Sequence, residues 1–377
     1  MLPLSLYIHI PWCLKKCPYC DFNSHAIKSD LPEKAYVECL LNDLALDIAR
    51  FQIQRPLHSI FIGGGTPSLF SPASLSSLLD GIAQQLTFNP DIEITLEANP
   101  GTFEYQKFAE YRAMGINRLS IGIQSFNDDA LQALGRVHSA DDAKKAAEMA
   151  KTAGFDNVNL DLMFGLPQST IKSTLDDIET AMALQPTHIS FYQLTLEPNT
   201  YFHRYPPRLP TEDAIFSAQL VCQEHLAAKG YQQYEVSAYS LEGKQCRHNL
   251  NYWQFGDYLG IGAGAHGKIS LALPNQIIRT QKNKHPDHYQ QLLAQDRCEN
   301  TIACHELPLE FLMNHLRLKQ GFTTEHFQRV TGMSIEIIAP ILNDCIQDHL
   351  IQKSENTYQC SAQGWYFVDN ILQRFIL

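Results

Sequence analysis

The sequence predicts an α/β protein in which a partial barrel of six (β/α) units precedes a mainly helical, winged-helix-like C-terminal domain. Three observations support this prediction. Short β-rich runs alternate with helical patterns over the first two-thirds of the chain, as in a parallel sheet built from βαβ units. Polar and glycine-rich residues gather just after the ends of these runs. After about Gly267 the alternation gives way to helical patterns and one short hairpin.

The alternating part contains six expected strands, each followed by a connecting segment, often with helical spacing. The strands are expected at Ser5–Ile10, His58–Gly63, Ile92–Asn99, Arg118–Ser125, Asn157–Gly165 and His188–Thr195. The clearest helical segments are Pro32–Phe51, Pro72–Leu86, Ser139–Ala153, Ile171–Leu184 and Glu212–Lys229. Right-handed βαβ units give parallel strands. Six units are two short of the closed eight-stranded barrel, so a partial barrel and an open doubly wound sheet both fit this count.

The positions of the unusual residues favour the barrel. They lie at or just past the carboxyl ends of the expected strands, at Cys13–Cys20, Gly63–Pro67, Glu97–Pro100, Gln124–Phe126 and Asp161–Pro167. In a barrel these ends converge on one mouth, where catalytic groups collect. In a flat sheet they would be spread along an edge. We therefore expect one functional mouth.

The C-terminal part has a different pattern. Helices are expected at Leu307–Gln320, Thr324–Val330, Ile335–His349 and Gly364–Phe375, with a hairpin at Ile351–Ser361. From residue 282 onward there are 8 basic and 11 acidic residues, which disfavours DNA binding by this winged-helix-like part. We expect it to pack against or cover the barrel. The expected domains are a barrel over 1–240, a connecting segment over 241–280 and the helical domain over 281–377.

Composition and charge narrow the classes of function. The chain has 377 residues, 45% apolar and 18% charged, which is typical of a folded globular protein. Its formal net charge of −11 makes nucleic acid and anionic membranes poor first guesses as partners. No apolar run approaches the roughly 20 residues of a membrane span, and the N-terminus does not resemble a signal peptide. We expect a cytoplasmic protein.

Three of the ten cysteines lie close together, at Cys13, Cys17 and Cys20. Three thiolates on one short loop can hold three irons of an iron–sulfur cube and leave the fourth iron open. The alternative is a zinc site with His25 or His9 as fourth ligand. Zinc sites usually combine a Cys-x2-Cys pair with a second Cys or His pair, and none follows at a suitable spacing. The spacing favours the cluster over zinc.

A glycine triplet follows the second expected strand, in Gly63-Gly64-Gly65-Thr66-Pro67. Glycines leave backbone N–H groups bare, so that polar ligand atoms can approach closely. A tight turn would explain one glycine by geometry alone, but it explains three less easily. We therefore expect the triplet to contact a ligand.

Polar residues also occur at or after other strand ends: Glu97, Gln124, Arg136 and Asp161. A carboxylate such as Glu97 suits an ammonium group, and Arg136 suits a carboxylate. Together they would recognise a small zwitterion such as an amino acid. The alternative is that Glu97 and Arg136 pair with each other inside the barrel mouth.

In combination these motifs resemble the radical SAM superfamily. The resemblance lies in Tyr7-Ile-His-Ile-Pro-Trp-Cys13, Cys17-Pro-Tyr19-Cys20, Gly63–Pro67 and Arg118–Phe126. Within the superfamily the chain is most similar to the oxygen-independent coproporphyrinogen III oxidase-like branch, over nearly its whole length. The fold of that family is a six-unit partial barrel, in agreement with the strand count.

The resemblance implies roles for particular residues. Cys13, Cys17 and Cys20 would ligate a [4Fe–4S] cluster whose open iron chelates S-adenosylmethionine. An electron from the cluster would cleave the sulfonium to methionine and a 5′-deoxyadenosyl radical. Some of the matching positions belong to a second S-adenosylmethionine in the oxidase relative. The positions that match S-adenosylmethionine sites of the branch are Tyr7, Tyr19, Gly64, Gly65, Thr66, Glu97, Gln124, Arg136 and Asp161.

Two departures refine the resemblance. The oxidases carry a further cysteine two residues after the third cluster ligand, where this chain has Phe22. The segment His248-Asn249-Leu-Asn-Tyr252-Trp253 contains H-N-x-x-Y-W, the signature of HemW-type heme chaperones. The resemblance is therefore to that subgroup.

The subgroup implies heme as a further ligand. A neutral His248 imidazole can be an axial iron ligand, and Tyr252 and Trp253 offer flat apolar faces to a porphyrin. The alternative is a structural histidine in an aromatic cluster. The expected partners are heme and an acceptor hemoprotein, including one reached by transient contact at a membrane. The alternative functions are coproporphyrinogen III decarboxylation and radical chemistry on an unrelated substrate.

One motif is expected to be misleading. Residues Gly262-Ala-Gly264-Ala-His-Gly267 match G-x-G-x-x-G, the dinucleotide fingerprint. We expect no clear strand before it and no helix after it, so the required βαβ context is missing. It is interpreted as a close-packed turn near the adenosyl end of the cofactor, not as a site for NAD.

Overall fold

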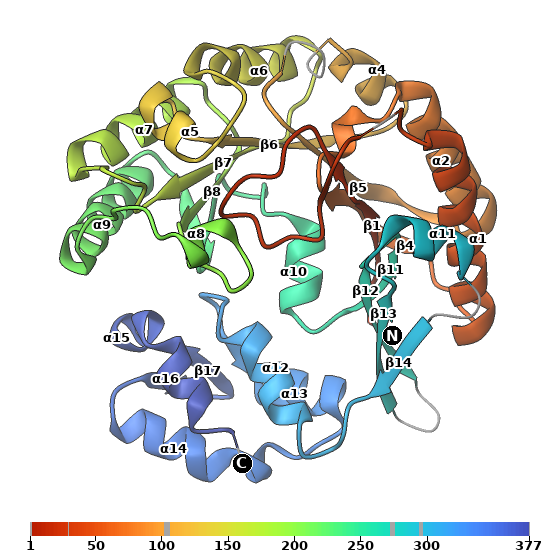
Figure 1. Cartoon of the computed structure of the whole chain (residues 1–377). Helices are drawn as coiled ribbons and strands as arrows, with labels where there is room; N and C mark the ends of the chain where they lie inside the picture. Colours follow the sequence, from red (N-terminus) through yellow and green to blue (C-terminus); the bar gives the residue numbers. More distant parts are fainter. Residues whose placement is uncertain (1, 29, 102–105, 272–275, 294–296, 377) are drawn as a thin grey trace.

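The computed structural model describes residues 2–28, 30–101, 106–271, 276–293 and 297–376. A curved sheet dominates it, and its six central strands run parallel and neighbour one another in chain order (Figure 1). These strands are β1 (Leu4–Ile10), β4 (Leu57–Gly64), β5 (Phe88–Ala98), β6 (Arg118–Gln124), β7 (Val158–Phe164) and β8 (His188–Gln193). The predicted partial barrel is confirmed.

Helices lie along the outer side of this curved sheet (Figure 1). Hydroxyl side chains begin several of them, and Ser139 and Thr170 each form a reciprocal capping box at a helix start. Alanines on the buried face of α6 allow close packing on the sheet. The helices of the barrel are α1 (Glu33–Phe51), α2 (Pro72–Gln85), α4 (Phe108–Ala113), α5 (Asp128–Ala133), α6 (Ala140–Thr152), α7 (Ile171–Ala183), α8 (Tyr201–Arg204) and α9 (Glu212–Ala228).

The sheet extends beyond the six predicted strands at both edges. Strand β11 (Asp257–Ile261) runs parallel to β1, and β12 (His266–Leu271), β13 (Gln276–Lys282) and β14 (Arg297–Thr301) continue it antiparallel. At the other edge, β10 (Ala238–Ser240) and β9 (Gln232–Glu235) pair antiparallel beyond β8. The sequence patterns did not predict these strands.

One of these strands corrects the interpretation of the G-x-G-x-x-G motif. The expectation that no strand leads into it is wrong, because β11 ends at Ile261 directly before Gly262. The motif opens no helix and instead connects β11 to the antiparallel β12. Gly262 has a φ of 104°, and a side chain there would overlap the backbone oxygen of His9. The expected close-packed turn is therefore confirmed.

A buried ionic cluster fastens the added strands to α1. Lys282 Nζ lies 2.6 Å from an oxygen of Asp43 and 2.9 Å from one of Asp47. Tyr289, on α11 (Pro286–Gln291), donates to Asp43 and accepts a hydrogen bond from the Gly262 amide. These groups are almost fully buried, so each must keep its partner. The cluster fixes the turn after β11 against the barrel.

The C-terminal helices enclose a second hydrophobic core around Phe311, Phe327 and Leu342. A three-stranded sheet in the order β15–β17–β16 forms the predicted wing. The expected last helix is instead two short helices, because Phe367 interrupts it with non-helical backbone. The elements are α12 (Leu307–His315), β15 (Phe322–Thr323), α13 (Thr324–Thr331), a 3-10 turn (Ile335–Ile337), α14 (Ala339–Gln347), β16 (Ile351–Ser354), β17 (Thr357–Cys360), α15 (Ala362–Tyr366) and α16 (Val368–Gln373).

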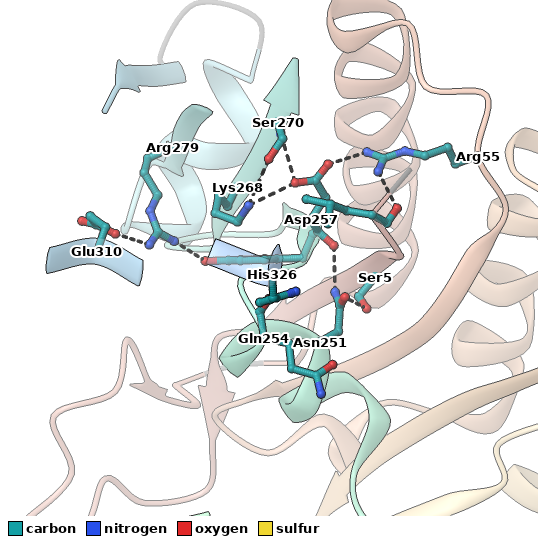
Figure 2. Close-up of polar contacts among 12 residues, drawn as sticks. Ser5, Arg55, Asn251, Gln254, Asp257, Lys268, Ser270, Arg279, Glu310 and His326 are labelled. Atoms are coloured by element: carbon teal, nitrogen blue, oxygen red, sulfur yellow. Dashed lines mark hydrogen bonds and ion pairs between the residues drawn. The ribbon is translucent and has the colours of Figure 1, made fainter. Parts of the chain in front are cut away.

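Polar contacts join these helices to the rest of the molecule (Figure 2). Arg279 on β13 donates to Glu310 on α12, at 2.5 Å. His326 on α13 lies 3.0 Å from the carbonyl oxygen of Gln254, at the end of α10 (Arg247–Trp253). Among the described helices, none is both long enough and apolar enough to span a bilayer.

Candidate functional site

The loop that follows β1 crosses the mouth of the barrel (Figure 1). Its ends are pinned because β2 (Trp12–Cys13) pairs with β3 (His25–Ala26). Inside the loop, the Cys20 amide donates to the Cys17 carbonyl at 3.1 Å, and Ile27 donates to the carbonyl of Cys13 at 3.0 Å. The backbone therefore holds Cys13, Cys17 and Cys20 on one tight turn.

The three thiols are free and line one cavity. Cys13 is buried, and burial raises the pKa of its thiol, whereas Cys17 and Cys20 are half-buried. Arg136 Nη1 lies 3.7 Å from the Cys17 sulfur and donates to it. Three thiols on one loop, one of them beside a guanidinium, suit three irons of a cluster.

The zinc alternative named His25 or His9 as the fourth ligand, and the structure argues against His9, whereas the buried Nε2 of His25 has no hydrogen-bond partner among the described residues. Both ring nitrogens of His9 are engaged, one 2.9 Å from the Tyr7 hydroxyl and the other 2.8 Å from the Asn23 carbonyl oxygen. Across the described residues, no three or more His, Cys, Asp or Glu side chains are grouped to hold a metal ion. The thiols are therefore not arranged around a single ion with His9.

The first cavity, defined by its lining residues, lies below the cysteine loop at the strand ends. It contains every predicted S-adenosylmethionine residue except Tyr7. The lining residues are Cys13, Lys15, Lys16, Cys17, Tyr19, Cys20, Phe22, Ser24, Gly64, Gly65, Thr66, Pro67, Glu97, Ala98, Asn99, Ser120, Gly122, Gln124, Arg136, Asp161 and Tyr192. The predicted convergence of the strand ends on one mouth is confirmed.

The glycine triplet brings β4 against the cysteine loop. The Gly65 amide donates to Ile10 at 2.8 Å and the Thr66 amide to Trp12 at 2.7 Å. A side chain on Gly65 would overlap the Trp12 backbone, and Gly64 has a φ of 121°. Close packing thus explains these glycines, while Gly64, Gly65 and Thr66 still line the cavity.

Two carboxyl groups face the first cavity with no cation paired to either among the described residues. Glu97 accepts a hydrogen bond from the Gly64 amide at 3.0 Å. Burial, together with the neighbouring Asp161, raises the pKa of Glu97 to about 8. Burial also raises the pKa of Asp161, which accepts hydrogen bonds from Ser120 and Asn159. A cationic ligand would stabilise both carboxylates.

Arg136 does not pair with Glu97, so that alternative from the sequence is wrong. Its Nη2 donates to Asn99 at 2.6 Å and to the Gly122 carbonyl at 2.8 Å. Its buried Nε has no hydrogen-bond partner among the described residues. A buried donor without a partner is costly, so a ligand acceptor at this point would be favourable.

Two further predicted residues lie on the wall of the first cavity. Gln124 ends β6 with a φ of 71°, and its side-chain oxygen accepts from the Tyr192 hydroxyl at 2.6 Å. A left-handed backbone conformation is strained in residues other than glycine, and such residues occur more often at functional sites. Tyr19 packs against Phe202 on α8, with ring centroids 6.4 Å apart.

A second cavity of about 800 Å³ adjoins the first. Tyr7, predicted among the S-adenosylmethionine residues, lines this cavity and not the first. The lining residues are Tyr7, His9, Lys16, Asp21, Phe22, Asn23, Phe61, Gly64, Glu97, His248, Asn249, Tyr252, Trp253, Tyr258, Gly264, His266 and Lys284. Lys16, Phe22, Gly64 and Glu97 belong to both cavities.

His248 forms part of the floor of the second cavity. Its Nδ1 lies 3.2 Å from the Ser59 hydroxyl, and its ring centroid is 5.1 Å from that of Phe61. Burial, with a contribution from Arg118, lowers the pKa of His248 to about 3, so the imidazole is neutral. None of the described residues hydrogen-bonds to Nε2. The neutral ring thus has one nitrogen without a protein partner.

The start of α10 fixes this histidine. Glu93 accepts hydrogen bonds from the amides of Arg247 and His248, at 3.0 and 3.2 Å. A carboxylate at a helix N-terminus satisfies the amides left free there. Tyr252 and Trp253 follow on the same helix and meet edge to face, with centroids 4.7 Å apart. The guanidinium of Arg317 lies over the Trp253 ring, 4.4 Å from its centroid, and both aromatic side chains line the second cavity.

Comparisons with known proteins agree with this geometry. Residues 7–181 match the model of the Radical SAM superfamily, and residues 303–367 match the HemN C-terminal domain. The chain is 50% identical over 379 residues to the heme chaperone HemW of Haemophilus influenzae, covering 99% of this chain and 98% of that protein. The chain belongs to the HemW family of radical SAM proteins. It is also 47% identical over 377 residues to the heme chaperone HemW of Escherichia coli, covering 99% of this chain and 98% of that protein.

Among solved structures, the HemW-family chain is similar to coproporphyrinogen III oxidase (HemN) from Escherichia coli, described as a radical SAM enzyme. The TM-score is 0.84 at 22% identity, covering 99% of this chain and 90% of the oxidase. This similarity supports the fold of the barrel and of the C-terminal domain.

Sequence reasoning missed several residues of this HemW-family chain that line the cavities. Asn99 links Arg136 to Thr66, and Tyr192 holds Gln124. Both follow from the rule that polar residues at strand ends face the mouth, since Asn99 follows β5 and Tyr192 is near the end of β8. Tyr258 on β11 gave no such signal, because that strand was not predicted.

Proposed function

We propose that this chain is a heme chaperone that binds heme in the second cavity and passes it to an acceptor hemoprotein. The observation that carries the proposal is the neutral, buried His248 on the floor of an aromatic cavity beside the cysteine loop. The volume of the second cavity, about 800 Å³, lies in the range of pockets that bind large ligands. The names of the HemW relatives support heme as the cargo.

The second cavity matches the two chemical halves of heme. Phe61, Tyr252 and Trp253 provide apolar rings for the porphyrin plane. Lys284 and Lys16 lie on the cavity lining without an acidic ion-pair partner among the described residues, and they suit the propionate carboxylates. We place the porphyrin over His248 with its propionates toward these lysines.

The first cavity is proposed to hold the resident cofactors. Cys13, Cys17 and Cys20 would ligate a [4Fe–4S] cluster, which supplies an electron to S-adenosylmethionine when both are bound. Glu97 and Asp161 would face the cationic part of S-adenosylmethionine, and the unpartnered Nε of Arg136 would meet an acceptor. The other predicted contacts are Tyr19, Gly64, Gly65, Thr66 and Gln124, with Tyr7 reaching from the second cavity.

Heme transfer from loaded protein tests the proposal. Cluster-loaded protein saturated with heme is mixed anaerobically with an immobilised apo-hemoprotein, and the heme on each partner is followed by absorbance. We expect heme to move to the acceptor from the parent protein. An acceptor that gains heme no faster than it does from free heme in the presence of albumin would contradict the proposal.

The competing function is oxidation of coproporphyrinogen III, and it is tested in parallel. Phe22 stands where the oxidases have cysteine, and 64% of its surface is exposed between the two cavities. We expect no protoporphyrinogen from coproporphyrinogen, S-adenosylmethionine and reductant, either in the parent or after Phe22→Cys. Product formation by the parent would favour the oxidase.

A further inference from the structure

A buried chain of hydrogen bonds lies behind His248 and connects three elements. Asn251 Nδ2 on α10 lies 2.9 Å from Ser5 Oγ on β1 and 2.9 Å from the Asp257 carbonyl oxygen (Figure 2). Ser5 Oγ is 2.7 Å from Ser59 Oγ on β4, which is 3.2 Å from His248 Nδ1. All four side chains are buried, with Ser5 and Ser59 inaccessible to solvent.

The orientation of the Asn251 amide sets the direction of this chain. Its nitrogen faces the Asp257 carbonyl oxygen and must donate there, because two oxygens would repel. The carboxylate of Asp257 is held by Lys268 at 3.1 Å and by Arg55 at 2.7 Å, so the carbonyl is fixed in place (Figure 2). Gly256 leaves the room that the amide oxygen occupies, since a side chain there would overlap it.

The direction then passes from group to group. The Asn251 nitrogen cannot accept, so Ser5 accepts from it and has one proton left to donate. Among the described residues, Ser59 is the acceptor for the Ser5 proton. Ser59 in turn donates its own proton to His248 Nδ1. The reverse order would leave the buried Ser5 hydroxyl proton without an acceptor, which is unfavourable.

We infer that Asn251, Ser5 and Ser59 are positioning residues that fix His248 as the tautomer with its proton on Nε2. The ring therefore meets an incoming ligand as an N–H donor rather than as a free lone pair. The consequence for heme rests on the proposed function. To form an Fe–Nε2 bond, the proton on Nε2 must be relayed by solvent to Nδ1. Nδ1–H would then donate to Ser59, Ser59 would turn its own proton to Ser5, and the Ser5 proton would be left without an acceptor among the described residues. Iron ligation is thereby weakened by roughly tenfold, which suits release of the cargo.

The tautomer is measured in the heme-free, cluster-loaded protein. Long-range proton–nitrogen correlation spectra of ¹⁵N-histidine-labelled protein distinguish protonated from unprotonated ring nitrogens, and His248→Gln identifies the His248 signals. We expect the proton on Nε2 in the parent. In Asn251→Asp, a carboxylate accepts from Ser5 and reverses the chain, so the proton should move to Nδ1. Ser68→Ala is the matched control, because the Ser68 hydroxyl is buried without a described partner.

A parent proton on Nδ1, or a folded Asn251→Asp variant with an unchanged tautomer, overturns the inference. If circular dichroism shows that Asn251→Asp does not fold, Asn251→Ala is used instead. This variant removes the fixed donor, so a measurable fraction of His248 should carry its proton on Nδ1. The absence of any such fraction overturns the inference. Heme titration then separates the two proposals. Asn251→Asp should ligate heme iron about tenfold more tightly than the parent. If the parent carries the proton on Nε2 and Asn251→Asp carries it on Nδ1, but neither protein binds heme, the heme function is rejected and the tautomer assignment is supported.

Discussion

The two cavities share part of their lining but differ in the chemistry of the side chains around them. The first contains ionisable groups without an ion-pair partner among the described residues: Glu97 and Asp161, whose pKa values are raised by burial, and Arg136 with a free buried donor. The second is lined largely by rings and holds a neutral His248. The first is suited to a small, charged ligand held by directional contacts. The second is suited to a large, flat ligand held by contact area.

The largest effect is expected at the cysteine loop. Reconstituted parent protein should hold about four irons per chain, and Cys17→Ala should lose most of them because two thiolates cannot retain the cube. Iron and sulfide analysis after anaerobic reconstitution measures this. Cys304→Ala, at an exposed thiol away from the loop, is the control. Equal iron loss in both variants, or zinc in place of iron, would contradict the assignment.

The next effect concerns the charged wall of the first cavity alone. Arg136→Met should weaken S-adenosylmethionine binding by about 2–5 kcal/mol, since a buried charge-assisted contact is lost. Heme binding should be unchanged, because Arg136 does not line the second cavity. Calorimetric titration of cluster-loaded protein gives both affinities. Arg112→Met, exposed on α4, controls for loss of charge. A parallel loss of heme affinity would mean that the cavities are not separate sites.

A smaller effect is expected from pH at the shared wall. The folded pKa of Glu97, about 8, lies above its ordinary value of 4.5. The folded protein therefore keeps a proton that the unfolded chain releases. Its stabilising contribution is complete below pH 4.5 and is lost as the pH rises through 8. Glu97→Gln should remove this dependence, so its advantage in unfolding free energy over the parent should grow by about 4 kcal/mol from pH 5 to pH 9.

Urea unfolding at several pH values measures this difference without S-adenosylmethionine. Glu148→Gln, at an exposed position of α6, should leave the pH profile unchanged. Binding of S-adenosylmethionine near pH 7 should also release protons from Glu97, because the sulfonium cation favours the ionised carboxylate. A pH-independent difference between Glu97→Gln and the parent would show that Glu97 is ionised throughout.

The contrast between the cavities also explains what the sequence could predict. The first cavity is made from the ends of consecutive parallel strands, so the position of a polar residue after its strand was enough to place Glu97, Gln124 and Asp161. The second cavity is completed by β11 and α10, which meet β1 and β4 across long stretches of chain: Asp257 pairs with Leu4, and His248 contacts Ser59, 189 residues earlier. Local sequence patterns contain no information on such pairings. Only the H-N-x-x-Y-W motif indicated that this region is a ligand site.

The same reasoning accounts for the details that were missed. Whether Arg136 pairs with Glu97 or with Asn99 depends on side-chain geometry inside the mouth, and residue types allow both. The hydrogen-bond chain from Asn251 to His248 depends on the register of β1 against β4 and on the placement of α10. Strand positions were predictable from alternation, but contacts between distant elements required the structure.

The central claim is that heme binds at His248 in a cavity distinct from the cluster site. It is tested most directly by anaerobic heme titration of the parent, His248→Ala, Cys17→Ala and the control His225→Ala, a partly exposed residue of α9. The expected result is a shifted Soret band and weaker heme retention in His248→Ala, with parent-like heme spectra in Cys17→Ala and His225→Ala. Parent-like heme binding in His248→Ala together with its loss in Cys17→Ala would contradict the claim and place heme at the cysteine loop.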